Sequence, residues 1–207
     1  MSERQHRRIF FLAGEQSGDL HGSLVINHLR QISPDIVVDG IGGPMMKAAG
    51  MNCIHSSDEL AVIGFVEVLK NIRHLFRILK DVRRWLAHTR PDMIVLIDYP
   101  GFNQRVAEIA RSLDIHVLYY ICPQVWAWHA SRVEKITRLI NEAVVVFPFE
   151  VDIWARAGAT VNWFGHPLVG FAKPSGSPDE LRAELKGSAE SLISLLPGSR
   201  TQEIYYI

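Results

Sequence analysis

The chain has 207 residues, of which 48% are hydrophobic and 21% are charged, and its formal net charge at pH 7 is zero. This composition is that of a soluble globular protein with room for one domain and part of a second. It argues against a dedicated nucleic-acid-binding protein, which would need an excess of Lys and Arg. The two cysteines have no CxxC or Cys/His spacing, so they indicate neither a disulfide framework nor a zinc site and fit a reducing cytosol.

The basic start MSERQHRR is followed by only five apolar residues before Gly14. Such a run is too short for the core of a signal peptide or for a membrane span. We therefore expect neither export by that route nor a membrane-spanning segment at this end.

Short runs of β-branched, aromatic and aliphatic residues recur along the chain and are typical of buried strands: 8–13, 36–41, 93–98, 115–121, 143–147 and 160–164. Helix-like stretches lie between them: 20–31, 103–113, 130–140 and 149–157. This alternation predicts an α/β domain with a doubly wound, Rossmann-like parallel sheet covered on both faces.

Pro, Gly and Ser cluster over residues 166–180, which is typical of a linker. We predict a first domain over 1–170 and a second unit over 171–207. In the second unit, residues 178–186 are expected to form a helix and 191–196 a strand, followed by a loop and a helical turn. These pieces cannot bury a core of their own, so the second unit is expected to be incomplete unless it packs on the first or on a partner.

The segment GEQSGDLHG, residues 14–22, directly follows the first predicted strand. Ligands of parallel α/β sheets bind at the carboxyl ends of the strands, so its four polar side chains are candidate ligand contacts: Glu15, Ser17, Asp19 and His21. The structural alternative is a turn in which Ser17 or Asp19 caps the following helix. The segment does not match GxGxxG, which disfavours a Rossmann dehydrogenase.

The run MIVLIDYPGFN, residues 93–103, places Asp98 at the carboxyl end of another predicted strand. A carboxylate there, close to low-dielectric walls, can act as a general base on an alcohol. The alternative is a capping or turn aspartate beside Pro100 and Gly101. Asn103 lies at the start of the following helix.

Two further segments follow predicted strands. In ICPQVWAWHASR, Trp126 and His129 are candidates for sugar or acyl contacts, although a purely structural role stays open for both. In LPGSR, the backbone of Gly198 and Ser199 together with the Arg200 guanidinium suits a phosphate or diphosphate, with an ordinary turn as the alternative. No histidine pair has the spacing of a metal site.

Residues 62–86 combine apolar side chains at helical spacing with six basic residues and only two acidic ones. This is the composition of a helix that lies in an anionic membrane interface. A core-facing helix with a solvated basic face is the alternative, and the sequence leaves both open. The predicted membrane-facing side chains are Val66, Val68, Leu69, Ile72, Leu75 and Phe76.

Taken together and in order, the segments GEQSGDLHG, IDYPGFN, PQVWAW, GHPL and LPGSR resemble those of the lipid-A-disaccharide synthases, which are glycosyltransferases of the two-domain GT-B type. The resemblance runs through the whole chain. It implies that residues 1–170 are the acceptor- and membrane-facing domain. It also implies that 171–207 are a linker and the beginning of the domain that binds the nucleotide sugar.

The resemblance implies transfer of 2,3-diacylglucosamine from its UDP carrier to the 6-hydroxyl of 2,3-diacylglucosamine 1-phosphate, at the cytoplasmic face of the bacterial inner membrane. In this scheme Asp98 is the general base, and Gly198, Ser199 and Arg200 hold the UDP diphosphate. Asn103 orients the acceptor, and neither a metal nor another cofactor is required. A homodimer is left open by the sequence.

Two other readings remain open at this stage. One is a GT-B transferase or epimerase that acts on UDP-N-acetylglucosamine without acyl chains. The other is a catalytically incomplete module that binds the acceptor lipid or the membrane and needs a second chain to work.

Overall fold

The computed structural model describes residues 7–60, 65–124, 131–170 and 173–196, with side chains except at 65–71 and 131. The chain consists of two compact units, Met1–Gly165 and His166–Ile207. The predicted functional residues that the structure describes all belong to the first unit.

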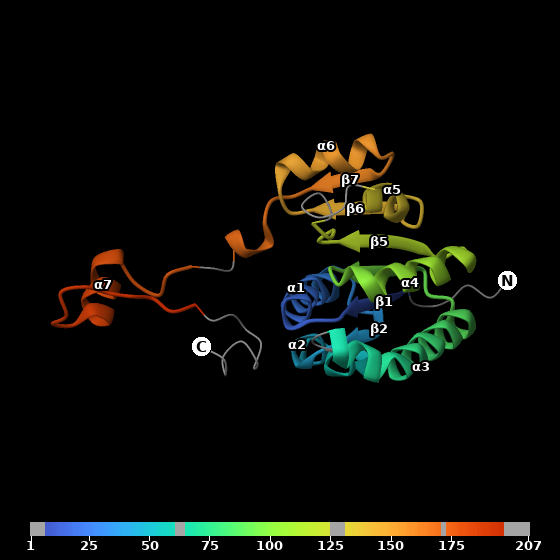
Figure 1. Ribbon diagram of the computed structural model, residues 1–207, viewed down its shortest axis with the longest axis horizontal. Helices are drawn as coiled ribbons and strands as arrows, with labels where there is room; N and C mark the ends of the chain where they lie inside the picture. Colours follow the sequence, from blue (N-terminus) through green and yellow to red (C-terminus); the bar gives the residue numbers. More distant parts are fainter. Residues whose placement is uncertain (1–6, 61–64, 125–130, 171–172, 197–207) are drawn as a thin grey trace. The chain divides into compact units, whose positions relative to one another are not determined.

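The first unit is built on one seven-stranded sheet in which all neighbouring strands are parallel (Figure 1). The order across the sheet is β3-β2-β1-β4-β5-β6-β7. The strands are β1 (Arg8–Ala13), β2 (Val37–Gly42), β3 (Asn52–Ser56), β4 (Met93–Ile97), β5 (His116–Tyr120), β6 (Glu142–Val145) and β7 (Thr160–Trp163). The doubly wound parallel sheet predicted from the sequence is confirmed.

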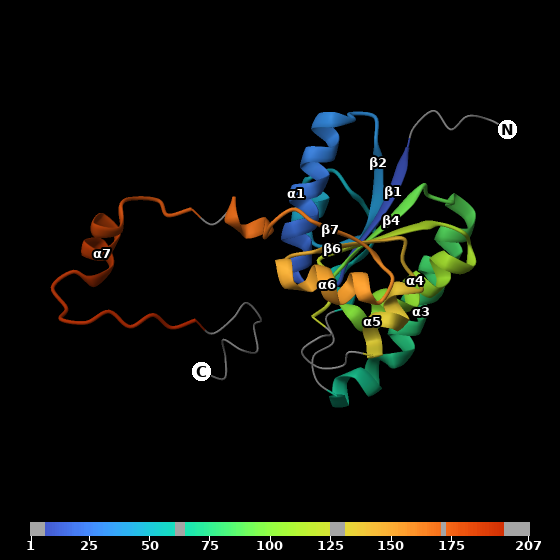
Figure 2. The ribbon, with the colours of Figure 1, turned by 90° about the horizontal axis from the view of Figure 1, so that it is seen from above.

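Helices cover both faces of this sheet, and each face has its own apolar core. In β1, Phe10 and Leu12 enter one core while Phe11 and Ala13 enter the other, since successive side chains of a strand point to opposite faces. Figure 2 shows α1 on one side of the sheet and α3 and α4 on the other. The helices are α1 (Gln16–Ile32), α2 (Pro44–Ala48), α3 (Phe65–Thr89), α4 (Pro100–Ser112), α5 (Ser131–Thr137) and α6 (Pro148–Arg156).

The sequence located the strands with long apolar runs but missed β3 and α2. β3 lies at the edge of the sheet, and its residues NCIHS are exposed or only partly buried. Three of its five residues are polar, Asn52, His55 and Ser56, so it lacks the apolar run by which central strands were recognised. The other edge strand, β7, was predicted from the run TVNWF. A single 3-10 turn, η1 (Ser57–Glu59), follows β3.

The second unit contains a short 3-10 turn, η3 (Pro167–Val169), and the helix α7 (Pro178–Lys186). The helix predicted over 178–186 is confirmed, and it starts with a capping box between Ser177 and Glu180. The strand predicted over 191–196 is wrong, because these residues have no regular secondary structure. Within the described part of this unit no other strand is present to supply ladder hydrogen bonds.

Candidate functional site

The segments that follow β1 and β4 lie side by side at the carboxyl ends of the strands. These strands are neighbours, with Ala13 paired to Ile97. From β1 the chain proceeds to β2 and β3 on one side, and from β4 it proceeds to β5, β6 and β7 on the other. The carboxyl ends of β1 and β4 therefore form the topological switch point, where open α/β sheets bind their ligands. Glu15 follows β1 and Asp98 follows β4, so both lie there.

The segment GEQSGDLHG forms the entry into α1, which begins at Gln16. Glu15 is the N-cap residue, with an extended backbone and a half-buried side chain, and Ser17 in the first turn is exposed. Asp19 and His21 are buried. Of the four polar residues predicted to contact substrate, Glu15 and Ser17 are thus the ones whose side chains reach the surface.

The Asp19 carboxylate binds the backbone at the start of α2. Its Oδ1 accepts hydrogen bonds from the backbone N–H groups of Gly43 (2.8 Å) and Met46 (2.9 Å), and its Oδ2 accepts one from Met45 (2.9 Å). The side chain is only 2% exposed. The carboxylate thus satisfies N–H groups at the start of α2 and ties the segment after β1 to the segment after β2.

Asp98 sits in a strained turn between β4 and α4. Asp98 and Tyr99 both have positive φ, 43° and 48°, a conformation that is uncommon for residues other than glycine. Two such residues in succession persist only where the surroundings hold them, and such strain is concentrated at functional sites. This turn holds Asp98 close enough to Glu15 for the two charges to interact.

Three hydrogen bonds hold the Asp98 backbone in this conformation. Its N–H donates to the carbonyl of Ile121 (3.3 Å). Its carbonyl accepts from the Asn103 amide (2.6 Å) and from the Tyr119 hydroxyl (2.7 Å). Asn103 is fully buried and also donates to the carbonyl of Ile97 (3.1 Å), so its amide group supports the turn.

Tyr99 closes the turn against the segment after β1. Its ring lies over Gly14, where a Cβ atom would collide with the ring carbons, and its hydroxyl donates to the carbonyl of Leu60 (2.6 Å). The sequence analysis missed Tyr99 and Tyr119 as supports of Asp98. Tyr99 is part of the motif IDYPGFN and could have been noticed, whereas Tyr119 is one residue of an apolar strand and gives no such signal.

The surroundings of Asp98 raise the pKa of its carboxyl group. Burial is the largest cause, the nearby charge of Glu15 adds to it, and a hydrogen bond from the Tyr99 N–H opposes it. A raised pKa makes the carboxylate a stronger base. The geometry and the charge at this point therefore suit removal of a proton from a hydroxyl group.

The sequence profile of the lipid-A-disaccharide synthetase family matches residues 9–207. The chain belongs to this family. Two curated relatives, both named lipid-A-disaccharide synthase, come from Geobacter metallireducens and Geobacter sulfurreducens. They are 42% and 43% identical to the chain over 205 residues, which is 99% of this chain and 53% of each relative. The chain thus spans about half the length of the curated relatives it matches.

A solved structure shares the fold of this member of the lipid-A-disaccharide synthetase family. It is that of a protein from Listeria monocytogenes, described under the name UDP-N-acetylglucosamine 2-epimerase. The TM-score is 0.62 at 7% sequence identity, over 86% of this chain and 51% of that one. At this identity the likeness supports the doubly wound fold alone.

Several predicted residues of this family member fall outside the described part of the chain: Trp126, His129, Gly198, Ser199 and Arg200. Among the predicted membrane-facing residues, the side chains of Val66, Val68 and Leu69 are likewise not described. Ile72 and Phe76 are 41% and 63% exposed, whereas Leu75 packs against the core on the α3 side of the sheet.

Within the described residues, no cluster of His, Cys, Asp and Glu could hold a metal ion. Nor does any described helix combine the length and apolarity needed to cross a membrane.

Proposed function

We propose that this chain carries the acceptor-activating part of a lipid-A-disaccharide synthase. The reaction joins 2,3-diacylglucosamine from its UDP carrier to the 6-hydroxyl of 2,3-diacylglucosamine 1-phosphate, and it yields a β-1,6 disaccharide and UDP. Family membership supports the reaction class. The observation that carries the assignment to this domain is the strained, hydrogen-bonded Asp98 turn at the switch point, where burial and Glu15 raise the pKa of the carboxyl group.

In the proposed step, Asp98 accepts the proton of the acceptor 6-hydroxyl. The oxygen attacks the anomeric carbon of the donor sugar, whose bond to the UDP oxygen breaks with inversion. Glu15 and Ser17 reach the surface next to Asp98 and contact the sugars. Gly198, Ser199 and Arg200 bind the departing diphosphate, and Trp126 and His129 contact sugar or acyl groups. No metal ion or other cofactor takes part in this step.

The test is acceptor-dependent UDP release by the 207-residue chain from UDP-2,3-diacylglucosamine in mixed micelles. Release that requires the acceptor lipid supports a complete synthase. No release, with the acceptor lipid still bound, contradicts catalysis by this chain and makes it an acceptor-binding module instead. UDP-N-acetylglucosamine as the sole accepted donor would favour a transferase without acyl specificity.

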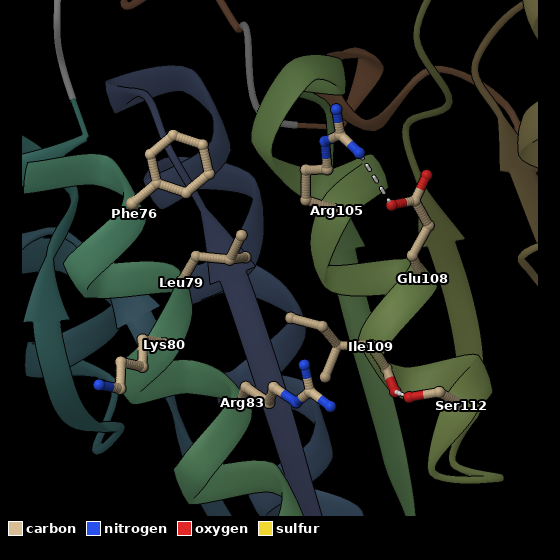
Figure 3. A pocket seen from close by; sticks show the side chains of 8 residues that line it. All are labelled: Phe76, Leu79, Lys80, Arg83, Arg105, Glu108, Ile109 and Ser112. Carbon is tan, nitrogen blue, oxygen red and sulfur yellow. Dashed lines mark hydrogen bonds and ion pairs between the residues drawn. The ribbon is translucent and has the colours of Figure 1, made fainter. Parts of the chain in front are cut away.

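We further propose that α3 and α4 face the cytoplasmic leaflet of the inner membrane. A groove of about 620 Å³ lies between these helices (Figure 3). Leu79 and Ile109 line it from opposite sides, and Phe76 lies at its upper end in the view. The groove is also lined by Lys80 and Arg83, and by Arg105, which is paired with Glu108 (3.2 Å). Apolar and cationic groups thus adjoin along α3, as in a helix that binds an anionic lipid surface.

The Phe76→Ser variant is expected to bind vesicles of phosphatidylethanolamine and phosphatidylglycerol roughly ten- to a hundredfold more weakly than the wild type. Inserting one phenylalanine side chain into the interface contributes about 1.5–3 kcal/mol, and this contribution is lost. Vesicle co-sedimentation measures the affinity. Ile32→Ser is the control, since Ile32 is 82% exposed at the end of α1. An equal loss in both variants would contradict a membrane contact specific to α3.

A further inference from the structure

A second pocket opens at the carboxyl edge of the sheet, beside β2 and β3. Its volume is about 480 Å³, within the range of small-molecule sites. Gly43 at the start of α2 forms part of its wall, and the polar groups that line it come from α2, β3 and η1: Lys47, Cys53, His55, Ser56 and Glu59. None of these residues is part of the site around Asp98.

The acidic residue of this pocket is already bound within the protein. Glu59 Oε1 accepts the Ser56 N–H (2.9 Å), and its Oε2 lies 3.1 Å from His55 Nδ1 and 3.9 Å from His74 Nε2. The backbone hydrogen bond is the main cause that lowers the pKa of Glu59. Both carboxylate oxygens of Glu59 therefore already have partners within the protein.

Lys47 is the cationic residue of the pocket. Lys47 is exposed, and no carboxylate in the described part of the chain lies within ion-pair distance of its ammonium group. The Ser56 hydroxyl accepts the Asp58 N–H (3.2 Å), which leaves its proton able to donate. Lys47 and Ser56 thus offer donors to an anion, whereas both ring nitrogens of His55 face carboxylates of the protein, Glu59 at 3.1 Å and Asp81 at 3.6 Å.

The pocket and the Asp98 turn lie along the same edge of the sheet. Asp98 follows β4 and Gly43 follows β2, with only β1 between these strands. The two strand spacings from β4 to β2 correspond to roughly 10 Å, and the three from β4 to β3, which carries Ser56, to roughly 14 Å. The hydrogen bonds from Gly43, Met45 and Met46 to Asp19 fix this wall of the pocket to the segment that carries Glu15.

We propose that this pocket receives the phosphate of the acceptor sugar, with the Lys47 ammonium as its principal ligand and the Ser56 hydroxyl as a second donor. The proposal rests on the proposed function and deepens it. It orients the acceptor with the reacting hydroxyl at Asp98 and the phosphomonoester at the β2–β3 side. A phosphorylated acceptor is then selected over the same sugar without phosphate.

Cys53 provides a reporter that does not depend on catalysis. It lines the pocket and is an exposed free thiol, while Cys122 is buried. Iodoacetamide is therefore expected to alkylate Cys53 first. Glucosamine 1-phosphate is the water-soluble probe, with glucosamine and inorganic phosphate as comparisons at equal ionic strength. The measured quantity is the ratio of alkylation rates without and with the probe, followed by mass spectrometry.

Glucosamine 1-phosphate is expected to slow alkylation of Cys53 at saturation, whereas glucosamine and inorganic phosphate at the same concentration have little effect. The Lys47→Gln variant is expected to need about tenfold more probe, since a charge-assisted hydrogen bond is lost. Lys173→Gln, which removes an exposed lysine of the second unit, is expected to behave as wild type. Burial raises the pKa of the Cys53 thiol and the charge of Lys47 opposes this rise, so each variant is compared with its own rate without probe.

Equal protection by inorganic phosphate would overturn the proposal, because the pocket would then bind any phosphate. Unchanged protection in Lys47→Gln would overturn it as well. Protection without UDP release would support the pocket and contradict the proposed catalysis, whereas UDP release without protection would do the reverse. The two proposals can therefore fail separately.

Discussion

The Asp98→Asn variant is expected to lower acceptor-dependent UDP release by about 10²–10⁴-fold, because an amide cannot accept the proton of the acceptor hydroxyl. Asparagine has nearly the same shape, and the backbone hydrogen bonds from Asn103 and Tyr119 to the carbonyl of residue 98 do not involve the side chain. Binding of the acceptor lipid is therefore expected to change little. Release is followed in mixed micelles, and binding is followed by equilibrium titration.

The same substitution is expected to stabilise the fold at pH 7. Burial and the charge of Glu15 raise the pKa of Asp98 in the folded state, so ionisation of this group costs free energy of folding. That cost is absent below the unfolded-state pKa of about 3.9, grows as pH rises toward the folded-state pKa, and is fully present above it. Removing the charge is expected to raise Tm by roughly 1–4 °C at pH 7.

The pH dependence separates this effect from a general change in packing. The difference in Tm between Asp98→Asn and wild type should shrink as pH falls and vanish where Asp98 is protonated in both states. Asp35→Asn is the control, since Asp35 is exposed in the loop before β2. A lower Tm for Asp98→Asn at pH 7, or undiminished UDP release, would contradict the role assigned to Asp98.

Replacing Asp19 by alanine is expected to destabilise the fold by roughly 3–5 kcal/mol. The substitution leaves the N–H groups of Gly43, Met45 and Met46 without their carboxylate acceptor, in a region where Asp19 is only 2% exposed. It also removes a negative charge from the N-terminal end of α2. Thermal unfolding should show a Tm lowered by roughly 10 °C or more.

Ser17→Ala is the matched control for this loss, because Ser17 lies two residues earlier in the same motif and is exposed. Its free energy of unfolding should stay within about 0.5 kcal/mol of wild type. The free energy of unfolding of Asp19→Asn should lie between those of Ser17→Ala and Asp19→Ala. The amide oxygen of asparagine can still accept a hydrogen bond, but its NH₂ group would face a backbone donor. Similar stabilities for Asp19→Ala and Ser17→Ala would contradict the structural role of Asp19.

The sequence by itself determined the order of the strands and helices whose burial in the core requires a continuous apolar pattern. Central parallel strands are buried on both faces, so runs such as IFFLA and MIVLI must be continuously apolar and can be read directly. It also placed Asp98 at the carboxyl end of the strand predicted over 93–98. The edge strand β3 was missed because Asn52, His55 and Ser56 interrupt its apolar pattern.

Only the tertiary structure decided which polar residues of the motif GEQSGDLHG are structural and which reach the surface. Glu15, Ser17 and Asp19 are neighbours in sequence, yet α1 begins at Gln16 and turns Asp19 inward to the α2 loop while Glu15 and Ser17 stay at the surface. Likewise, Tyr119 supports Asp98 from the next strand of the sheet. Local patterns follow from the burial that each segment needs. Hydrogen bonds between segments far apart in sequence depend on which strands become neighbours, and no single segment contains that information.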